Sequence, residues 1–108
     1  MPTTDPLRFA DHTGRVALVT GAASGIGRAV VEALVAQGAI VEATDRDADG
    51  LVALADGLGG ERVHTTALDV TDRDAVQAVV EATAARHGGL DVLVCSAGVA
   101  FADDEARD

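Results

Sequence analysis

Short runs of apolar residues alternate along the chain with longer segments in which apolar residues recur at helical spacing. The first run, residues 14–20, is continuously apolar at its centre, as in a strand that is buried on both faces of a sheet. Three further runs are predicted to be strands: residues 39–45, 62–68 and 90–95. The chain therefore carries four predicted strands.

The segments between these strands have the pattern of amphipathic helices. The first helix is predicted over residues 25–37, and a second, capped by Asp47, is predicted to reach about residue 58. A third is predicted to start from a Thr71 cap, with Asp74 in a capping-box position. Their apolar faces are expected to comprise Ile26, Val30, Ala33 and Leu34 in the first helix, Leu51, Leu54, Ala55 and Leu58 in the second, and Val76, Val79, Val80 and Thr83 in the third.

This alternation of strands and helices predicts an α/β fold with a parallel sheet and right-handed crossovers. A chain of 108 residues is one domain at most. We expect residues 1–13 to be an N-terminal tail and residues 14–100 to form the domain. The acid-rich residues 101–108 are expected to be a frayed end.

The chain is acidic, with a net charge of −10 and an isoelectric point near 4.4. Such a surface repels nucleic acids and anionic membranes, so neither is an expected partner. No apolar run approaches the roughly 20 residues of a membrane-spanning helix, and the first residues lack the apolar segment of a signal peptide. Cys95 is the single cysteine, which excludes an intrachain disulfide and fits a reducing cytoplasm.

Histidine and cysteine give no sign of a metal or thiol site. His12, His64 and His87 are scattered without the spacing of metal ligands, so no metal is predicted. Cys95 is interpreted as a small buried side chain rather than a reactive thiol.

The glycine-rich stretch between the first strand and the first helix carries the clearest functional pattern. Gly21 permits the turn out of the strand, Gly25 lets a diphosphate approach the backbone, and Gly27 lets the helix pack close to the sheet. The N–H groups of the turn, around Ser24 and Ile26, and the positive end of the helix dipole then face the phosphates. The alternative is a glycine-rich turn that binds nothing.

Asp45, at the end of the second predicted strand, indicates which dinucleotide the site takes. A carboxylate there accepts hydrogen bonds from the ribose hydroxyls of NAD and repels the 2′-phosphate of NADP. Arg46 would soften this preference by pairing with a phosphate, but Ser24, and no basic residue, precedes Gly25. The pattern therefore favours NAD; the alternative is an ordinary surface aspartate at a strand end.

The ends of the third and fourth strands complete the predicted site. Asp69 is expected to accept a hydrogen bond from the adenine amino group while Val70 flanks the ring; the alternative is a helix-entry aspartate before Thr71. Ligands of open α/β sheets lie across the carboxyl ends of the strands. The fourth strand ends in small residues that leave room for a cofactor: Ser96, Ala97 and Gly98.

Residues 14–27 resemble the cofactor motif of the short-chain dehydrogenase/reductases almost residue for residue. Asp45, the Asp69-Val70 pair and residues 90–94 also fall where that family places equivalent segments. The resemblance covers residues 14–98. It implies a Rossmann-type, doubly wound parallel sheet of about four strands in the order 3-2-1-4 with three helices, and a nicotinamide dinucleotide as cofactor.

The resemblance also implies catalysis by a Ser and a Tyr-x-x-x-Lys pair farther along such chains. There the Tyr is the general acid/base, the Lys lowers its pKa and holds the ribose, and the Ser polarises the substrate oxygen. This chain has no Tyr and no Lys, so no catalytic residue is predicted in it. Where the family has Asn-Asn-Ala-Gly, this chain has residues 95–98 as Cys-Ser-Ala-Gly, without the Asn that steadies the sheet centre.

Three functions remain open on the sequence. The first is the N-terminal, NAD-binding part of an oxidoreductase that moves a hydride between the nicotinamide and an alcohol or carbonyl. The second is a standalone NAD-binding or regulatory module, and the third is complementation by a second polypeptide that carries the catalytic half. The bare edge of the fourth strand is expected to favour self-association of the isolated chain, whereas a clean monomer at high concentration would favour the standalone module.

Overall fold

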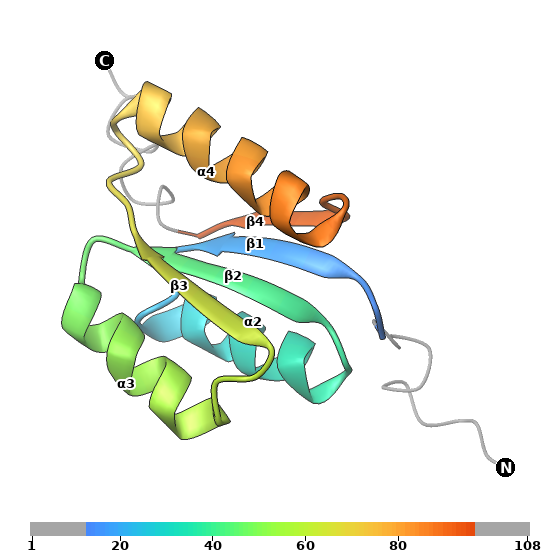
Figure 1. Ribbon diagram of the computed structural model, residues 1–108. Coiled ribbons are helices and arrows are strands. Elements are labelled where there is room, and N and C mark those ends of the chain that lie inside the picture. Colours follow the sequence, from blue (N-terminus) through green and yellow to red (C-terminus); the bar gives the residue numbers. More distant parts are fainter. Residues whose placement is uncertain (1–12, 97–108) are drawn as a thin grey trace, which may run out of the picture.

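The glycine-rich turn follows the central strand of a parallel sheet (Figure 1). In the computed structural model, which describes residues 13–96, β1 (Val16–Thr20) pairs on one side with β2 (Ile40–Asp45) and on the other with β4 (Val92–Cys95). β3 (Val63–Ala67) pairs with β2, which gives the order β3-β2-β1-β4 and confirms the predicted order. Every residue of β1 is buried, as its continuous apolar pattern predicted.

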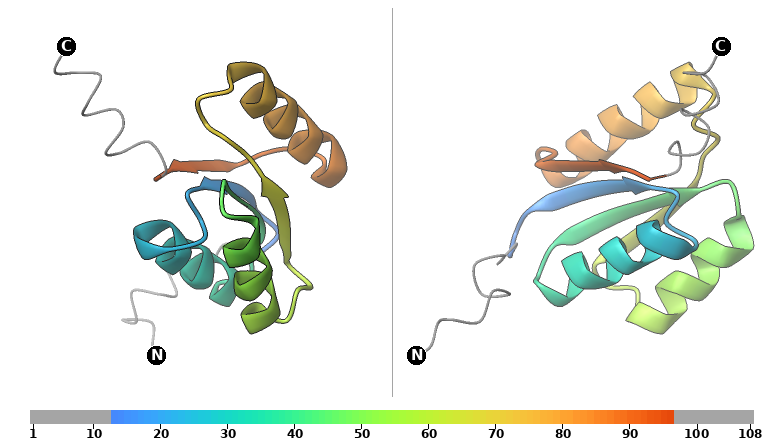
Figure 2. Two further views of the ribbon diagram at one scale, coloured as in Figure 1. Left: turned by 90° about the vertical axis from the view of Figure 1, so that its left-hand side faces the viewer. Right: turned by 180° about the vertical axis from the view of Figure 1, so that it is seen from behind.

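Helices cover both faces of the sheet (Figures 1 and 2). α2 (Gly25–Ala36) and α3 (Ala48–Leu58) lie on one face, and α4 (Arg73–His87) lies on the other. Each helix and strand falls within the range expected from the hydrophobic pattern. Within residues 13–96, no helix combines the length and the apolarity that crossing a membrane requires.

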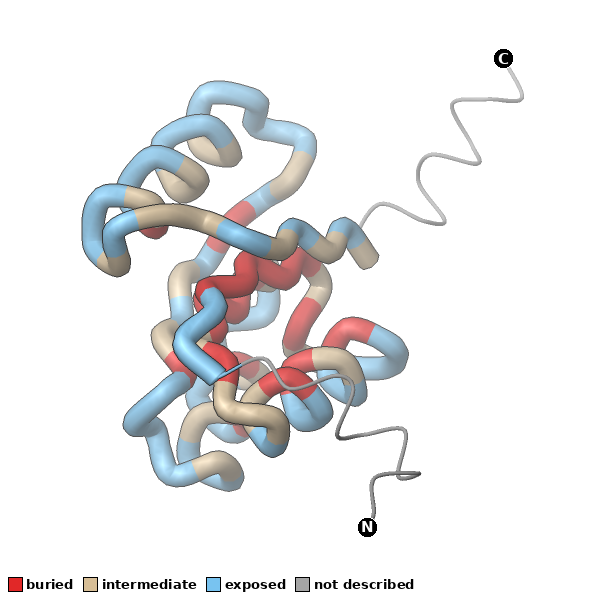
Figure 3. The backbone as a smooth tube through the Cα atoms, turned by 90° about the vertical axis from the view of Figure 1, so that its right-hand side faces the viewer, coloured by how far each residue is buried: buried red, intermediate tan, exposed pale blue. Residues whose placement is uncertain are grey.

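The main core lies between the sheet and the pair α2 and α3, where the buried backbone in Figure 3 is concentrated. Small β-branched and alanine side chains from the sheet meet larger ones from the helices, which permits close packing of helix on sheet. The core residues contributed by the two central strands and these two helices are Ala17, Val19, Val41, Ala43, Val31, Leu34, Leu51 and Leu54.

The predicted apolar face of α2 is confirmed at two of its four positions, since Leu34 is buried and Val30 packs against the core. Ile26 is 76% exposed and Ala33 is exposed, whereas Gly27, Val31 and Leu34 are the buried positions. The sequence pattern allowed either choice, because apolar residues flank both faces of this helix. The close approach of Gly27 to Gly21 in the turn favours the observed rotation of the helix.

Aspartate side chains cap the helices that follow β2 and β3. Asp47 accepts a hydrogen bond from the amide of Gly50 at 2.9 Å, which confirms the predicted cap of α3. The predicted Thr71 cap of α4 was wrong, since Asp72 caps this helix by accepting from the amide of Ala75 at 3.1 Å. Thr71 does not act as the cap because its hydroxyl donates to Asp69 instead.

The face under α4 is covered less completely than the opposite face. Thr83 is the single buried residue of α4, and Leu93 on β4 remains 54% exposed. Cys95 is exposed as well, so the expectation of a buried thiol was wrong. The reason is its position on β4, which is the edge strand of the sheet over the described residues.

A buried carboxylate lies beneath the end of α4. The side chain of Glu42, on β2, is only 3% exposed and accepts a hydrogen bond from the Thr66 hydroxyl at 2.9 Å. Arg86 donates to the other carboxylate oxygen at 3.2 Å, and Nε2 of His87 lies 3.9 Å from that same oxygen. These four residues, Glu42, Thr66, Arg86 and His87, form a polar cluster that links β2 and β3 to α4.

Candidate functional site

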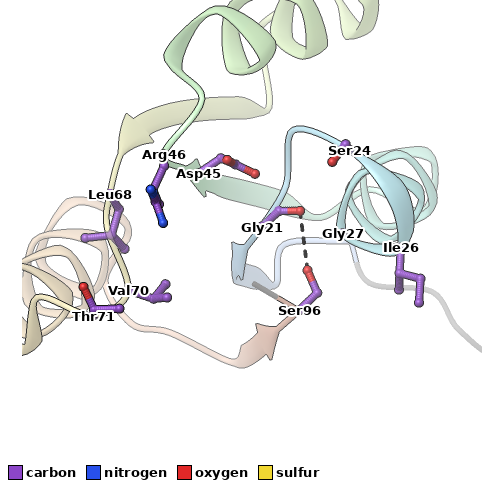
Figure 4. Close-up of a pocket in the computed structure, with 10 residues that line it drawn as sticks. All are labelled: Gly21, Ser24, Ile26, Gly27, Asp45, Arg46, Leu68, Val70, Thr71 and Ser96. Atoms are coloured by element: carbon purple, nitrogen blue, oxygen red, sulfur yellow. Dashed lines mark hydrogen bonds between the residues drawn. The ribbon is translucent and has the colours of Figure 1, made fainter. Parts of the chain in front are cut away.

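A pocket of about 470 Å³ opens at the carboxyl ends of the strands, beside the glycine-rich turn (Figure 4). This is the edge of an open α/β sheet at which ligands bind. The residues that line it come from the turn, from the ends of β2 and β4, and from the segment after β3: Gly21, Ser24, Ile26, Gly27, Asp45, Arg46, Leu68, Val70, Thr71 and Ser96. Most of the positions predicted from the sequence are thus brought together.

The three glycines of the turn are required for different structural reasons. Gly21 and Gly25 have φ angles of 68° and 62°, in the left-handed region that side chains other than hydrogen disfavour. Gly27 has ordinary helical geometry, but a Cβ there would lie 2.0 Å from the carbonyl oxygen of Gly21. Two positions therefore need an unusual backbone conformation, and the third needs room.

The N-terminus of α2 differs from those of the other helices in its electrostatics. Ser24 occupies the cap position without a side-chain hydrogen bond to the backbone, and the first turn of α2 holds no acidic residue. α3 and α4 each have an aspartate cap and a further aspartate in the first turn. Although the chain carries a charge of −10, no acidic side chain in the first turn offsets the positive end of the α2 dipole.

Asp45 lies at the pocket end of β2 with both carboxylate oxygens engaged. Its Oδ2 accepts from the amide of Ala23 in the glycine-rich turn at 3.0 Å, and its Oδ1 accepts from the amide of Asp47 at 2.9 Å. Arg46 is exposed and lines the pocket beside it (Figure 4). The end of β2 thus presents one fixed negative charge and one exposed positive charge to the same space.

The segment after β3 contributes differently from what the sequence suggested. Asp69 does not line the pocket; its Oδ1 accepts from the hydroxyl and the amide of Thr71 at 2.7 and 2.9 Å. Both hydrogen bonds lower the pKa of Asp69, and the one from the hydroxyl is the larger cause. Val70, which was expected to flank the adenine ring, lines the pocket, and Leu68 and Thr71, which sequence reasoning missed, line it too. Their one available signal was adjacency to the Asp69-Val70 pair.

Replacing Thr71 with valine is expected to raise the pKa of Asp69 toward its ordinary value. The substitution keeps the shape of the side chain but removes the hydroxyl donor, which is the largest cause of the lowered pKa. A lowered pKa stabilises the fold above the ordinary carboxyl pKa, and this stabilisation is lost as the pH falls through the folded-state value. The variant should therefore lose less stability on acidification. An NMR titration of the Asp69 carboxyl that is the same in both proteins would contradict this assignment.

Ser96 ties the end of β4 to the glycine-rich turn. Its hydroxyl donates to the carbonyl oxygen of Thr20 and lies 3.5 Å from that of Gly21 (Figure 4). The serine thus links the end of β4 to β1 at the position where the sequence lacked the family's asparagine. Ala97 and Gly98, which were also predicted to border the cofactor, lie outside the described residues.

Metal chemistry has no support in the described part of the chain. Among residues 13–96, no group of three or more His, Cys, Asp or Glu side chains is placed so that it could hold a metal ion. The pocket is instead a combination of a free helix N-terminus, a backbone turn and a carboxylate, which suits an extended anion that also carries hydroxyl groups.

Comparisons with known proteins agree with the motif. D-threitol dehydrogenase of Mycolicibacterium smegmatis is 54% identical over 89 residues, which cover 81% of this chain and 34% of that protein. The NAD(+)-dependent 2-dehydro-3-deoxy-L-rhamnonate dehydrogenase of a Sphingomonas species is 41% identical over 88 residues, covering 82% of this chain and 34% of that protein. The chain thus spans about a third of the length of these relatives.

Structure and family comparisons point the same way. The crystal structure of a short-chain dehydrogenase/reductase, a glucose/ribitol dehydrogenase from Brucella melitensis, matches with a TM-score of 0.73 and 39% identity, over 77% of this chain and 36% of that one. The sequence model of the short chain dehydrogenases matches residues 15–108. The chain therefore belongs to the short-chain dehydrogenase family of oxidoreductases.

Proposed function

We propose that this chain binds the adenosine and diphosphate part of NAD, as the N-terminal portion of a dehydrogenase that acts on an alcohol or carbonyl substrate. The observation that carries the proposal is the N-terminus of α2, which is free of acidic side chains and lies on the pocket beside Gly21 and Gly27. A diphosphate placed there accepts hydrogen bonds from the turn and is stabilised by the helix dipole. The bound nicotinamide would supply the hydride chemistry.

The preference for NAD over NADP rests on Asp45. Its carboxylate is held toward the pocket, where it accepts hydrogen bonds from ribose hydroxyls and repels a 2′-phosphate. The relative from Sphingomonas, which is named for NAD(+), supports the same choice. Arg46 acts in the opposite direction, as the one basic residue among the described residues that line the pocket.

Replacing Asp45 with alanine is expected to weaken NAD binding by roughly 1–3 kcal/mol, the cost of losing hydrogen bonds to a charged group. The same variant should bind NADP relatively better, because the repulsion of the 2′-phosphate is removed. Calorimetric titration of both nucleotides into both proteins measures the change. If neither affinity differs from that of the unmodified chain, Asp45 has no part in cofactor selection.

Catalysis is assigned to residues outside this chain. The 108 residues contain no Tyr and no Lys, so the family's proton-transfer pair is not among them. We expect the chain to bind NAD without turning it over, and expect a small-molecule substrate to bind only to the whole protein. A reducing cytoplasm is the proposed location. The edge position of β4 and the 54% exposure of Leu93 support self-association of the isolated chain.

A further inference from the structure

We propose that Asp45 has a second role: it is a positioning residue that holds the glycine-rich turn in shape before any nucleotide binds. The hydrogen bond from the Ala23 amide to Asp45 Oδ2, at 3.0 Å, joins the turn to the end of β2 across 22 positions of sequence. The part of this proposal that concerns affinity rests on the proposed function, whereas the part that concerns the free protein does not.

Backbone contacts show that the turn is built against β2. The amide of Ala22 donates to the carbonyl oxygen of Thr44 at 2.9 Å, so hydrogen bonding between the first segment and β2 continues two residues beyond the end of β1. The amide of the next residue, Ala23, donates to the side chain of Asp45 at the end of β2. The side chain therefore extends the attachment of the turn by one further residue.

Packing at the start of α3 holds the same residue from another side. A Cβ on Gly50 would lie 2.8 Å from the Cβ of Ala23, so the absence of a side chain at Gly50 is what lets α3 approach the turn. Gly50 also donates its amide to the Asp47 cap. Ala23 is thus enclosed by Asp45 and by the first turn of α3, and the position of the turn depends on both.

The orientation of the carboxylate is fixed by a second donor. The amide of Asp47 donates to Oδ1 at 2.9 Å, so each oxygen of Asp45 already accepts one backbone N–H. A carboxylate offers about four acceptor positions, which leaves two for the two hydroxyls of a ribose. Asp45 would therefore bind the ribose and hold the turn at the same time, and a substitution made to admit NADP would also loosen the diphosphate site.

Amide hydrogen exchange in the nucleotide-free 108-residue chain separates the two roles. In the Asp45→Ala variant, the amide of Ala23 is expected to exchange about tenfold faster, as for the loss of one hydrogen bond to a charged acceptor. The amide of Val19, within the sheet, should keep its rate. Asp49→Asn is the matched control, because Asp49 is an exposed acid at the start of α3 that does not line the pocket. It should leave Ala23 unchanged.

Binding of an NAD analogue whose adenosine ribose lacks both hydroxyls provides the second readout. Because this analogue cannot donate to Asp45, a purely ribose-binding Asp45 predicts equal affinities for the unmodified chain and the Asp45→Ala variant. The positioning role predicts that the variant binds the analogue about fivefold more weakly, the effect of one lost hydrogen bond. Asp45→Asn, which retains one acceptor oxygen, should lie between the two.

The outcomes are distinct for the two proposals. Unchanged Ala23 exchange, together with a loss of affinity seen for NAD but not for the analogue, overturns the positioning role and leaves the proposed function intact. If the unmodified chain binds neither nucleotide, the proposed function fails, and the exchange rate of Ala23 still decides whether Asp45 holds the turn. If circular dichroism shows Asp45→Ala to be unfolded, Asp45→Asn is compared by the same two measurements.

Discussion

Replacing Gly27 with alanine is expected to lower the free energy of unfolding by about 3 kcal/mol, the upper end of what one added carbon costs in a packed site. A Cβ at this position would lie 2.0 Å from the carbonyl oxygen of Gly21 and 2.5 Å from Oγ of Ser96. The nearest atom belongs to the backbone, so no rotation of a side chain relieves the overlap. α2 must move away from β1, and the buried Val31 and Leu34 move with it.

The same displacement should weaken NAD binding, because the turn at Gly21 and the N-terminus of α2 both move. Gly57→Ala is the matched control, since it adds the same carbon within a helix where a Cβ meets nothing within 4 Å. It is expected to stabilise the fold by about 0.5–1 kcal/mol through helix propensity. Urea denaturation of both variants tests the pair. Equal and small effects at the two positions would show that α2 tolerates a Cβ against the turn.

Gly27 also illustrates what the sequence predicted and what it did not. Continuous apolar runs such as β1 belong to strands buried on both faces, and the glycine spacing after them is specific, so the strands and the turn followed from the pattern. The strand order followed from the family resemblance instead. The rotation of α2 did not follow, because it depends on how closely Gly27 approaches Gly21 in space. Gly50 lowers the helix propensity of α3, yet it permits the approach of that helix to Ala23.

The orientation of side chains at the strand ends could not be predicted from the sequence for a similar reason. Asp69 stands at the predicted strand end, but its carboxylate turns to Thr71, and the pocket is lined by its neighbours Leu68 and Val70 instead. The nearby hydroxyl and amide of Thr71 determine this orientation, and the spacing of residues in the sequence does not predict it. Position along a strand therefore predicts which segment reaches the pocket more reliably than which side chain does.

The burial of Glu42 was likewise not predicted from the sequence, since nothing in its position between the apolar Val41 and Ala43 indicates a partner. Its main partner, Arg86, is 44 residues farther along the chain, in the last turn of α4. No local pattern joins the two positions. The two residues come together only because α4 crosses over the sheet. A substitution in this ion pair therefore tests what attaches α4 to the sheet.

Replacing Arg86 with alanine is expected to destabilise the fold by about 3 kcal/mol, the lower end of the range for removing one partner from a buried ion pair. The lower end applies because the arginine side chain is 52% exposed, although that of Glu42 is only 3% exposed. After the substitution, Glu42 retains the Thr66 hydroxyl as its hydrogen-bond donor, while His87 Nε2 lies 3.9 Å from the carboxylate, beyond hydrogen-bonding distance. A buried carboxylate would then lack its compensating charge.

Arg28→Ala is the matched control, because Arg28 and Glu32 on α2 form an ion pair of the same 3.2 Å length with both side chains about half exposed. That pair is expected to contribute at most about 0.5 kcal/mol. Glu42→Met provides the converse test: it replaces the buried charge by an apolar side chain of similar size, and in this background Arg86→Ala should cost little. Chemical denaturation of the single and double variants measures the coupling. If Arg86→Ala costs no more than Arg28→Ala, or costs the same with and without Glu42, burial of the carboxylate does not govern the attachment of α4 to the sheet.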